Sequence, residues 1–214
     1  MFTLVSIHSP EYRELSDLTW NKNKALFCDE HRLGGWCKEI PFSPKMCFNK
    51  FKMARGIFER YPHTRWVWAT GCDSMITNFK NDLRDIVANT EASLLVATDR
   101  NGINADSFFI KNSDAGLGII AQILELEPSV NEEQSAIIKL SSDNRFTGHI
   151  SIRPQREFNS YNYDLYPSPE QRFDKLGTDG HWRPGDLLIH WPGFADNVKM
   201  RIGWAKEYKN KVIY

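Results

Sequence analysis

A single carboxylate follows an apolar run in the first half of the chain. Residues 66–70, Trp-Val-Trp-Ala-Thr, have the composition of a strand buried on both faces, and Gly71 and Asp73 come directly after it. In open α/β sheets ligands bind at the carboxyl ends of the strands. Asp73 is therefore placed to hold a divalent cation or to bind a sugar or ribose hydroxyl. An acidic residue after a strand can equally cap the turn or helix that follows, and this stretch alone leaves both uses open.

The elements before Asp73 predict an α/β arrangement. Residues 2–8 predict a first strand, and Ser9-Pro10 is typical of a helix start, with the helix over residues 11–29. A glycine turn within residues 31–37 leads into a short second strand. Residues 46–58 carry apolar side chains at helical spacing, and the strand before Asp73 follows. This β-α-β-α-β order predicts a parallel sheet with crossover helices.

The middle of the chain is expected to continue the same pattern. We expect helices over residues 81–89 and 113–126, strands over 93–98 and 103–110, and a further apolar segment over 135–140. Residues 161–166, close to two prolines, predict a loop. A short strand over residues 185–190 ends in His190, and a basic helix closes the chain. Because neither repeats nor linkers interrupt the sequence, we expect one domain over residues 1–214.

The composition argues against several classes of function. Lysine plus arginine equal aspartate plus glutamate at 27 each, so the chain lacks the basic excess of a nucleic-acid-binding protein or a polybasic membrane segment. No apolar run is long enough to span a bilayer, and the first residues do not have the pattern of a signal peptide. The four cysteines have no CxxC spacing. We expect free thiols and a cytoplasmic protein.

Taken together, six segments in order along nearly the whole chain resemble glycosyltransferase family 34, the galactosyl-, mannosyl- and xylosyltransferases of the GT-A fold. The segments are Asn21-Lys22-Asn23-Lys24 with His31 and Gly34, Trp66 to Asn78, Asp99 to Asn112, Glu133-Gln134, Gln155 with residues 158–161, and Gly185-Asp186 with His190 and Gly193. The resemblance implies an α/β GT-A-type fold, with a mostly parallel central sheet flanked by helices and a Rossmann-like nucleotide-binding first half. The small size and the absence of an anchor segment favour a viral member, similar to chlorovirus glycosyltransferases.

The resemblance also implies a site for a nucleotide diphosphate-sugar donor and a glycan acceptor. Asp73 and His190 would bind the divalent cation, and their mixed oxygen and nitrogen donors favour Mn²⁺, with Mg²⁺ as the second choice. Glu133 and Gln134 would be the catalytic pair that contacts the sugar and stabilises positive charge at its anomeric carbon. Six further residues are expected to contact the donor, namely Asp99, Asn104 and Asp106 at the sugar and Ser6, Ile7 and His8 at the base. A UDP-sugar is the favoured donor, ahead of a GDP-sugar, and retention of anomeric configuration is expected.

Each of these residues also has a purely structural interpretation. His190 fits a core histidine at a strand end, Glu133-Gln134 fit the first turn of a helix, and the donor residues fit ordinary polarity at loops and strand ends.

The chain departs from the family pattern at three positions. Gly71 stands where the metal motif has its first aspartate, Asp106 stands where glycine is usual, and Ala195 falls near the lysine of plant members. We therefore expect a metal site with fewer protein ligands than usual. Two alternatives stay open: a non-catalytic protein that binds nucleotide sugars or glycans, and a sugar nucleotidyltransferase. The latter usually carries a basic, glycine-rich phosphate loop, which residues 6–14 lack.

Overall fold

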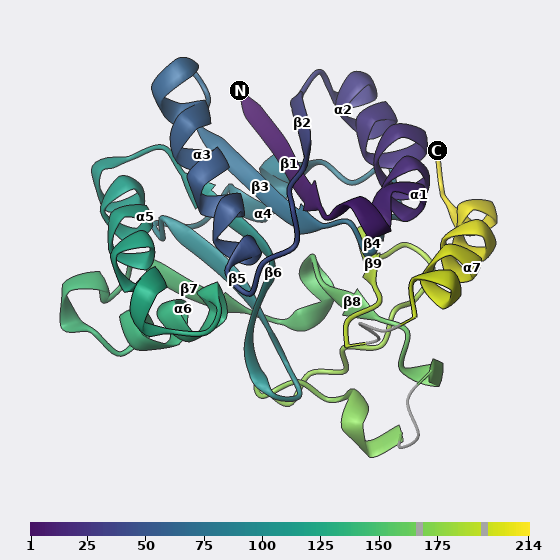
Figure 1. Cartoon of the computed structure of the whole chain (residues 1–214). Coiled ribbons are helices and arrows are strands. Elements are labelled where there is room, and N and C mark those ends of the chain that lie inside the picture. The colour runs from purple at the N-terminus through teal and green to yellow at the C-terminus, as the bar shows by residue number, and fades with distance from the viewer. Residues whose placement is uncertain (166–168, 194–196) are drawn as a thin grey trace.

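A six-stranded mixed sheet lies at the centre of the computed structural model, which describes residues 1–165, 169–193 and 197–214 (Figure 1). The strand order is β2-β1-β3-β6-β5-β7. The bounds are β1 Phe2–His8, β2 Gly34–Glu39, β3 Trp66–Gly71, β5 Leu94–Asp99, β6 Gly102–Lys111 and β7 Ile150–Arg153. A smaller sheet has the order β4-β9-β8, with β4 Ser74–Ile76, β9 Leu188–His190 and β8 Ser160–Tyr161. Ala195 and the end of the loop predicted over residues 161–166 lie outside the described residues.

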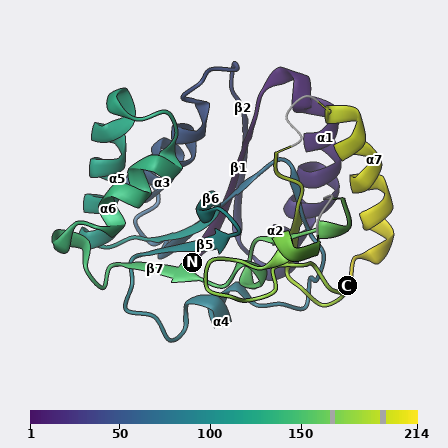
Figure 2. The same ribbon diagram turned by 90° about the horizontal axis from the view of Figure 1, so that it is seen from below.

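The helices flank this sheet. A continuous helical segment comprises a 3-10 turn Pro10–Tyr12, α1 Arg13–Ser16, a π-helix Asp17–Lys24 and α2 Ala25–His31. The other helices are α3 Asn49–Arg60, α4 Leu83–Val87, α5 Asp114–Leu126, α6 Glu133–Ser141 and α7 Val198–Tyr208. Short 3-10 turns span Met46–Phe48, Glu127–Ser129, Asn144–Phe146, Gln155–Glu157, Tyr163–Leu165, Pro169–Arg172 and Lys209–Lys211. Figure 2 shows α3, α5 and α6 on one side of the central sheet and α1 and α7 on the other.

Alternate residues of β1, β3, β5 and β6 face two separate cores, as the period of two in a strand requires. On one face, Phe108 of β6 stacks on Phe51 of α3 with the ring centres 4.2 Å apart, in a core shared with α5 and α6. On the other face, Trp68 and Phe109 stack at 5.3 Å and pack with the first helical segment and α4. A third cluster joins α1 and α7 to the small sheet. The small sheet is therefore held against the end of the large one.

The predicted β-α-β-α-β beginning is confirmed, because β1 pairs in parallel with both β2 and β3. The prediction that the middle of the chain continues this pattern is wrong for β6, which is antiparallel to both β3 and β5. Only residues 100 and 101 separate β5 from β6, and a connection that short makes a hairpin and not a crossover. Three of the five pairings are parallel, so the sheet is mostly parallel, as expected.

Two expectations from composition can be compared with the structure. All four cysteines carry free thiols, as their spacing predicts. In the three described ranges, none of the helices combines the length and the apolar character that crossing a bilayer requires.

Candidate metal centre

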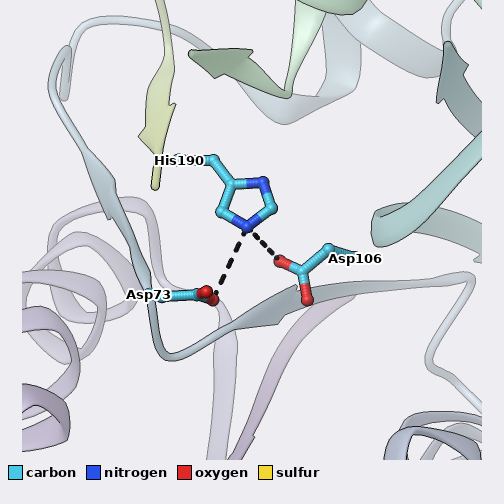
Figure 3. A group of neighbouring side chains, drawn as sticks. All are labelled: Asp73, Asp106 and His190. Atoms are coloured by element: carbon cyan, nitrogen blue, oxygen red, sulfur yellow. Dashed lines mark ion pairs between the residues drawn. The ribbon is translucent and has the colours of Figure 1, made fainter. Parts of the chain in front are cut away.

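Three side chains from distant parts of the sequence meet at the carboxyl end of β3 (Figure 3). Asp73 lies in the turn between β3 and β4, Asp106 lies in β6, and His190 ends β9. His190 Nε2 is 3.6 Å from Asp73 Oδ1 and 3.4 Å from Asp106 Oδ2, and one ligand atom from each residue lies within 4.8 Å of the other two. Adjacent ligands of an octahedral cation with bonds of roughly 2.1 Å are about 3 Å apart. These three atoms can therefore converge on one divalent cation with small movements.

Backbone pairing brings the three segments together. β4 and β9 are antiparallel with Ser74 opposite His190, and the Trp191 N–H donates to the Asp73 carbonyl oxygen at 2.9 Å. The His190 side chain is only 3% exposed, whereas the side chains of Asp73 and Asp106 are 18% and 26% exposed. A ligand that enters from solvent therefore meets the two carboxylates first, with the imidazole behind them.

Asn159 fixes the orientation and the tautomer of His190. Its side-chain oxygen lies 2.9 Å from His190 Nδ1, and its amide nitrogen donates to Asn104 Oδ1 at 3.0 Å, which sets the orientation of the amide. Because an amide oxygen only accepts, Nδ1 must carry the proton. Nε2 then faces Asp73 and Asp106, and it is the nitrogen that a cation between these groups would contact once Nε2 carries no proton.

The turn that carries Asp73 rests on buried polar residues of the π-helix. The ammonium of Lys24, which is fully buried, donates to the carbonyl oxygens of Gly71 and Ser74, both at 2.7 Å, and to Ser74 Oγ at 3.1 Å. Asn23 exchanges two hydrogen bonds with the backbone of Ile76. Burial lowers the pKa of Lys24 to about 8. Asn23 and Lys24, which belong to the segment that resembles the early family signature, thus stabilise the turn that carries Asp73.

Two buried cations compensate the carboxylates. Lys50 of α3 contacts Asp106 Oδ1 at 3.3 Å and Glu133 Oε1 at 3.2 Å, and Arg201 of α7 contacts Asp73 Oδ2 at 3.3 Å. Burial alone would raise the pKa of Asp73, but His190 and Arg201 outweigh burial and hold it well below its usual range. Burial likewise opposes ionisation of Asp106, yet Lys50 and His190 bring its pKa below the usual value. Both carboxyl groups are therefore ionised at neutral pH.

A cleft of about 240 Å³ opens beside this group. Of the residues predicted for the site, it is lined by Ile7, His8, Asp73, Asp106 and Glu133. Its wall also includes the apolar or aromatic side chains of Tyr12, Phe42 and Met46. Ile7, His8 and Glu133 therefore share one open space with Asp73 and Asp106.

The other predicted donor residues lie behind the lining. Ser6 is completely buried, and among the described residues its hydroxyl has no hydrogen-bond partner. Asp99 accepts from the Asn101 N–H at 2.7 Å and from the Tyr161 hydroxyl at 2.9 Å, and Gln134 Oε1 accepts from the Ala105 N–H at 3.3 Å. These contacts position the loop and strand around Asn104 and Asp106. Direct contacts of these residues with a donor stay predictions.

The sequence alone does not predict a role at the site for Lys50, Arg201 or Asn159. A lone lysine or arginine in an amphipathic helix is typical of a solvated face, and Asn159 belongs to a recognised motif without an obvious chemical role. The signal that could have found the two cations is an excess of carboxylates predicted at one strand end, because buried acids need compensating charge.

Structures with the same arrangement of elements are known. The chain is similar to a glycosyltransferase involved in the glycosylation of the major capsid of PBCV-1, with a TM-score of 0.73, 15% identity and coverage of 96% of this chain and 98% of that one. It is also similar to the galactosyltransferase LgtC, solved with donor and acceptor sugar analogs, with a TM-score of 0.54, 14% identity and coverage of 98% and 100%. The fold is therefore that of the GT-A glycosyltransferases.

The model of the galactosyl transferase GMA12/MNN10 family matches residues 87–197, just over half of the chain. The chain belongs to this family, and the resemblance stated from the sequence is confirmed. It is 22% identical over 192 residues to the probable alpha-1,2-galactosyltransferase gmh2 of Schizosaccharomyces pombe, covering 70% of this chain and 52% of the relative. For gmh1 of the same organism the identity is 24% over 198 residues, covering 72% and 55%. The chain thus spans about half the length of the curated relatives it matches.

Proposed function

We propose that this chain transfers a sugar from a nucleotide diphosphate-sugar, with a UDP-sugar favoured, to a glycan acceptor, and that the reaction requires a divalent cation. The observation that carries this proposal is the convergence of Asp73, Asp106 and His190 beside a cleft, in a chain of this family. Because the curated relatives are named alpha-1,2-galactosyltransferases, galactose is the first donor sugar to test.

The three residues fit a divalent cation by their chemistry as well as by their spacing. Two carboxylate oxygens suit Mg²⁺ or Mn²⁺, and one neutral imidazole shifts the preference toward Mn²⁺. A bound cation would act as a Lewis acid that neutralises the charge developing on the departing diphosphate. Asp73 and Asp106 would supply anionic oxygens on the cleft side, and His190 would supply the nitrogen from behind.

The charged neighbours have separate tasks in this proposal. The guanidinium of Arg201 is held by the Trp191 carbonyl oxygen at 3.0 Å and the Tyr12 hydroxyl at 2.8 Å, and it lines the cleft beside Asp73. It would add a fixed positive charge for an anionic leaving group. Lys50 holds Asp106 and Glu133 in place, because its ammonium contacts both carboxylates.

We expect the anomeric configuration of the donor to be retained. The acceptor hydroxyl would attack from the face that the leaving phosphate occupies, and this phosphate would accept the proton. No protein base is then needed. The Glu133 carboxylate, which lines the cleft, would stabilise positive charge at the anomeric carbon, and Gln134 would support it from the same helix turn.

The proposal is tested by incubating the protein with UDP-galactose, UDP-glucose, UDP-xylose and GDP-mannose, each with Mn²⁺ and with a chelator. We expect release of nucleotide diphosphate from one donor with Mn²⁺ and none in chelator. Asp73→Ala and His190→Ala should each lower the rate by roughly a hundredfold or more, whereas His63→Ala, at an exposed histidine, should leave it unchanged. Proton NMR of the first product should show the donor's configuration. Failure with all four donors, or an inverted product, would contradict the proposal.

A further inference from the structure

Two of the departures from the family pattern face each other in the structure. β3 and β6 are antiparallel, and Gly71 and Asp106 each lie two residues beyond their last paired residues, Ala69 and Phe108. The Gly71 N–H donates to Asp106 Oδ2 at 2.9 Å. A Cβ atom added to Gly71 would lie 2.5 Å from that same oxygen. A carboxylate carried by either position would therefore reach the same point in space.

The space above Gly71 is already filled by the metal group. A Cβ atom at this position would lie 2.5 Å from Asp106 Oδ2, 2.6 Å from Asp106 Oδ1 and 2.5 Å from Asp73 Oδ1. All three distances are shorter than a tolerable contact. Gly71 is not among the glycines with positive φ, so its backbone would accept another residue. Position 71 must therefore be glycine because the carboxylates of Asp73 and Asp106 occupy the space that a Cβ atom would need.

We propose that positions 71 and 106 share one metal-binding carboxylate. In this chain Asp106 supplies it from β6, in place of the aspartate that the family motif carries at the end of β3, and glycine at one position is the condition for aspartate at the other. This inference rests on the metal centre of the proposed function. The sequence predicts a metal site with fewer protein ligands than usual. Asp106 of the neighbouring strand β6 would instead supply the carboxylate that Gly71 lacks.

Lys50 anchors the relocated carboxylate. Its ammonium, on a side chain only 3% exposed, contacts the backbone carbonyl oxygens of Ala105 and Asp106 at 2.9 and 3.0 Å and Asp106 Oδ1 at 3.3 Å. One carboxylate oxygen is thus bound to the lysine, while Oδ2 faces His190. The buried ammonium of Lys50 compensates the charge of the Asp106 carboxylate and fixes its orientation.

The test is calorimetric titration of MnCl₂ into the protein with and without UDP, for Asp106→Gly, Gly71→Asp and the double exchange Gly71→Asp/Asp106→Gly. Asp106→Gly should weaken Mn²⁺ binding by roughly tenfold or more, because a ligand is lost. Gly71→Asp should also weaken it, because two carboxylates cannot occupy one space. The double exchange should recover most of the affinity, so that the two substitutions are strongly non-additive.

Two further variants decide the matter if the double exchange does not fold. Gly71→Ala adds only the clashing methyl group and should weaken Mn²⁺ binding, whereas Gly56→Ala, at an exposed glycine with open space around its Cα, should not. Asp106→Asn keeps the shape of the side chain and removes its charge, and should weaken binding too. Unchanged affinity in Asp106→Gly or Asp106→Asn would overturn the inference, as would a folded double exchange that binds no better than Asp106→Gly. Calorimetry needs no turnover, so inactivity of the wild type toward every donor would refute the proposed function and leave this result standing.

Discussion

Replacing Asn159 with alanine tests whether the tautomer of His190 controls metal binding. Asn159 is completely buried and is the hydrogen-bond acceptor of His190 Nδ1. Without it, the imidazole is free to place its proton on Nε2 and to donate to Asp73 or Asp106, which are 3.6 and 3.4 Å away. That tautomer cannot bind a cation through Nε2. Loss of a partner that orients a metal-binding histidine typically lowers metal affinity by about 10- to 100-fold.

The same substitution should lower stability. It leaves the buried His190 Nδ1–H without its partner, at a cost of roughly 1–3 kcal/mol, whereas Asn104 Oδ1 keeps the Asp106 N–H as a donor. Calorimetric Mn²⁺ titration in the presence of UDP measures the affinity, and ¹⁵N NMR of the histidine ring reports the tautomer. Asn159→Asp keeps an acceptor for Nδ1–H and should retain binding, and Asn21→Ala, at an exposed asparagine, serves as the control. Wild-type affinity in Asn159→Ala, or an unchanged Nδ1–H tautomer, would refute this reasoning.

Two further predictions concern the turn and its charges. Lys24→Met removes a donor from the buried carbonyl oxygens of Gly71 and Ser74, of which the Gly71 oxygen keeps the Ser74 hydroxyl, and should lower the free energy of unfolding by about 1–3 kcal/mol in urea titration. Lys22→Met breaks only an exposed pair with Asp17 and should leave that free energy nearly unchanged. Equal effects would contradict the supporting role of Lys24. Because the pKa of Asp73 lies below its ordinary value of 3.8 in the fold, its ionised form contributes stability at neutral pH that is lost as the pH falls through that value and below it. The unfolding free energies of metal-free wild type and Asp73→Asn should therefore differ by a constant amount down to about pH 4 and converge as the pH falls further, and a difference that stays constant below that pH would exclude this contribution.

Local patterns predicted most of the elements around the site. The apolar runs at β1 and β3 and the helical spacing in α3 are strong periodic signals, and each gives an element close to its predicted bounds. The short strands β4, β7 and β8 have no such signal and were not predicted. The direction of β6 was mistaken because residues 93–110 were interpreted as two strands of a repeated parallel pattern. The short link between the two predicted strands, residues 99–102, was the available evidence for a hairpin.

The metal group shows where reasoning from a single sequence ends. Asp73 and His190 were predicted as ligands from their motifs, and the structure brings them together. Asp106 was predicted to contact the donor sugar, yet it lies beside these two residues, because the pairing of β3 with β6 brings its carboxylate to the Gly71 N–H. A register between strands some forty residues apart is a non-local property. The compensating cations Lys50 and Arg201 come from helices that only the folded chain brings to the same cleft.

The central claim is that Asp73, Asp106 and His190 form the divalent-cation centre of a nucleotide-sugar site. Crystals grown with Mn²⁺ and UDP, measured at the manganese absorption edge, test it most directly. We predict one anomalous peak within bonding distance of His190 Nε2 and of one oxygen from each aspartate, with the diphosphate of UDP on its open side, and no such peak in crystals grown with chelator. UDP bound in the cleft with no manganese at these three residues would contradict the account.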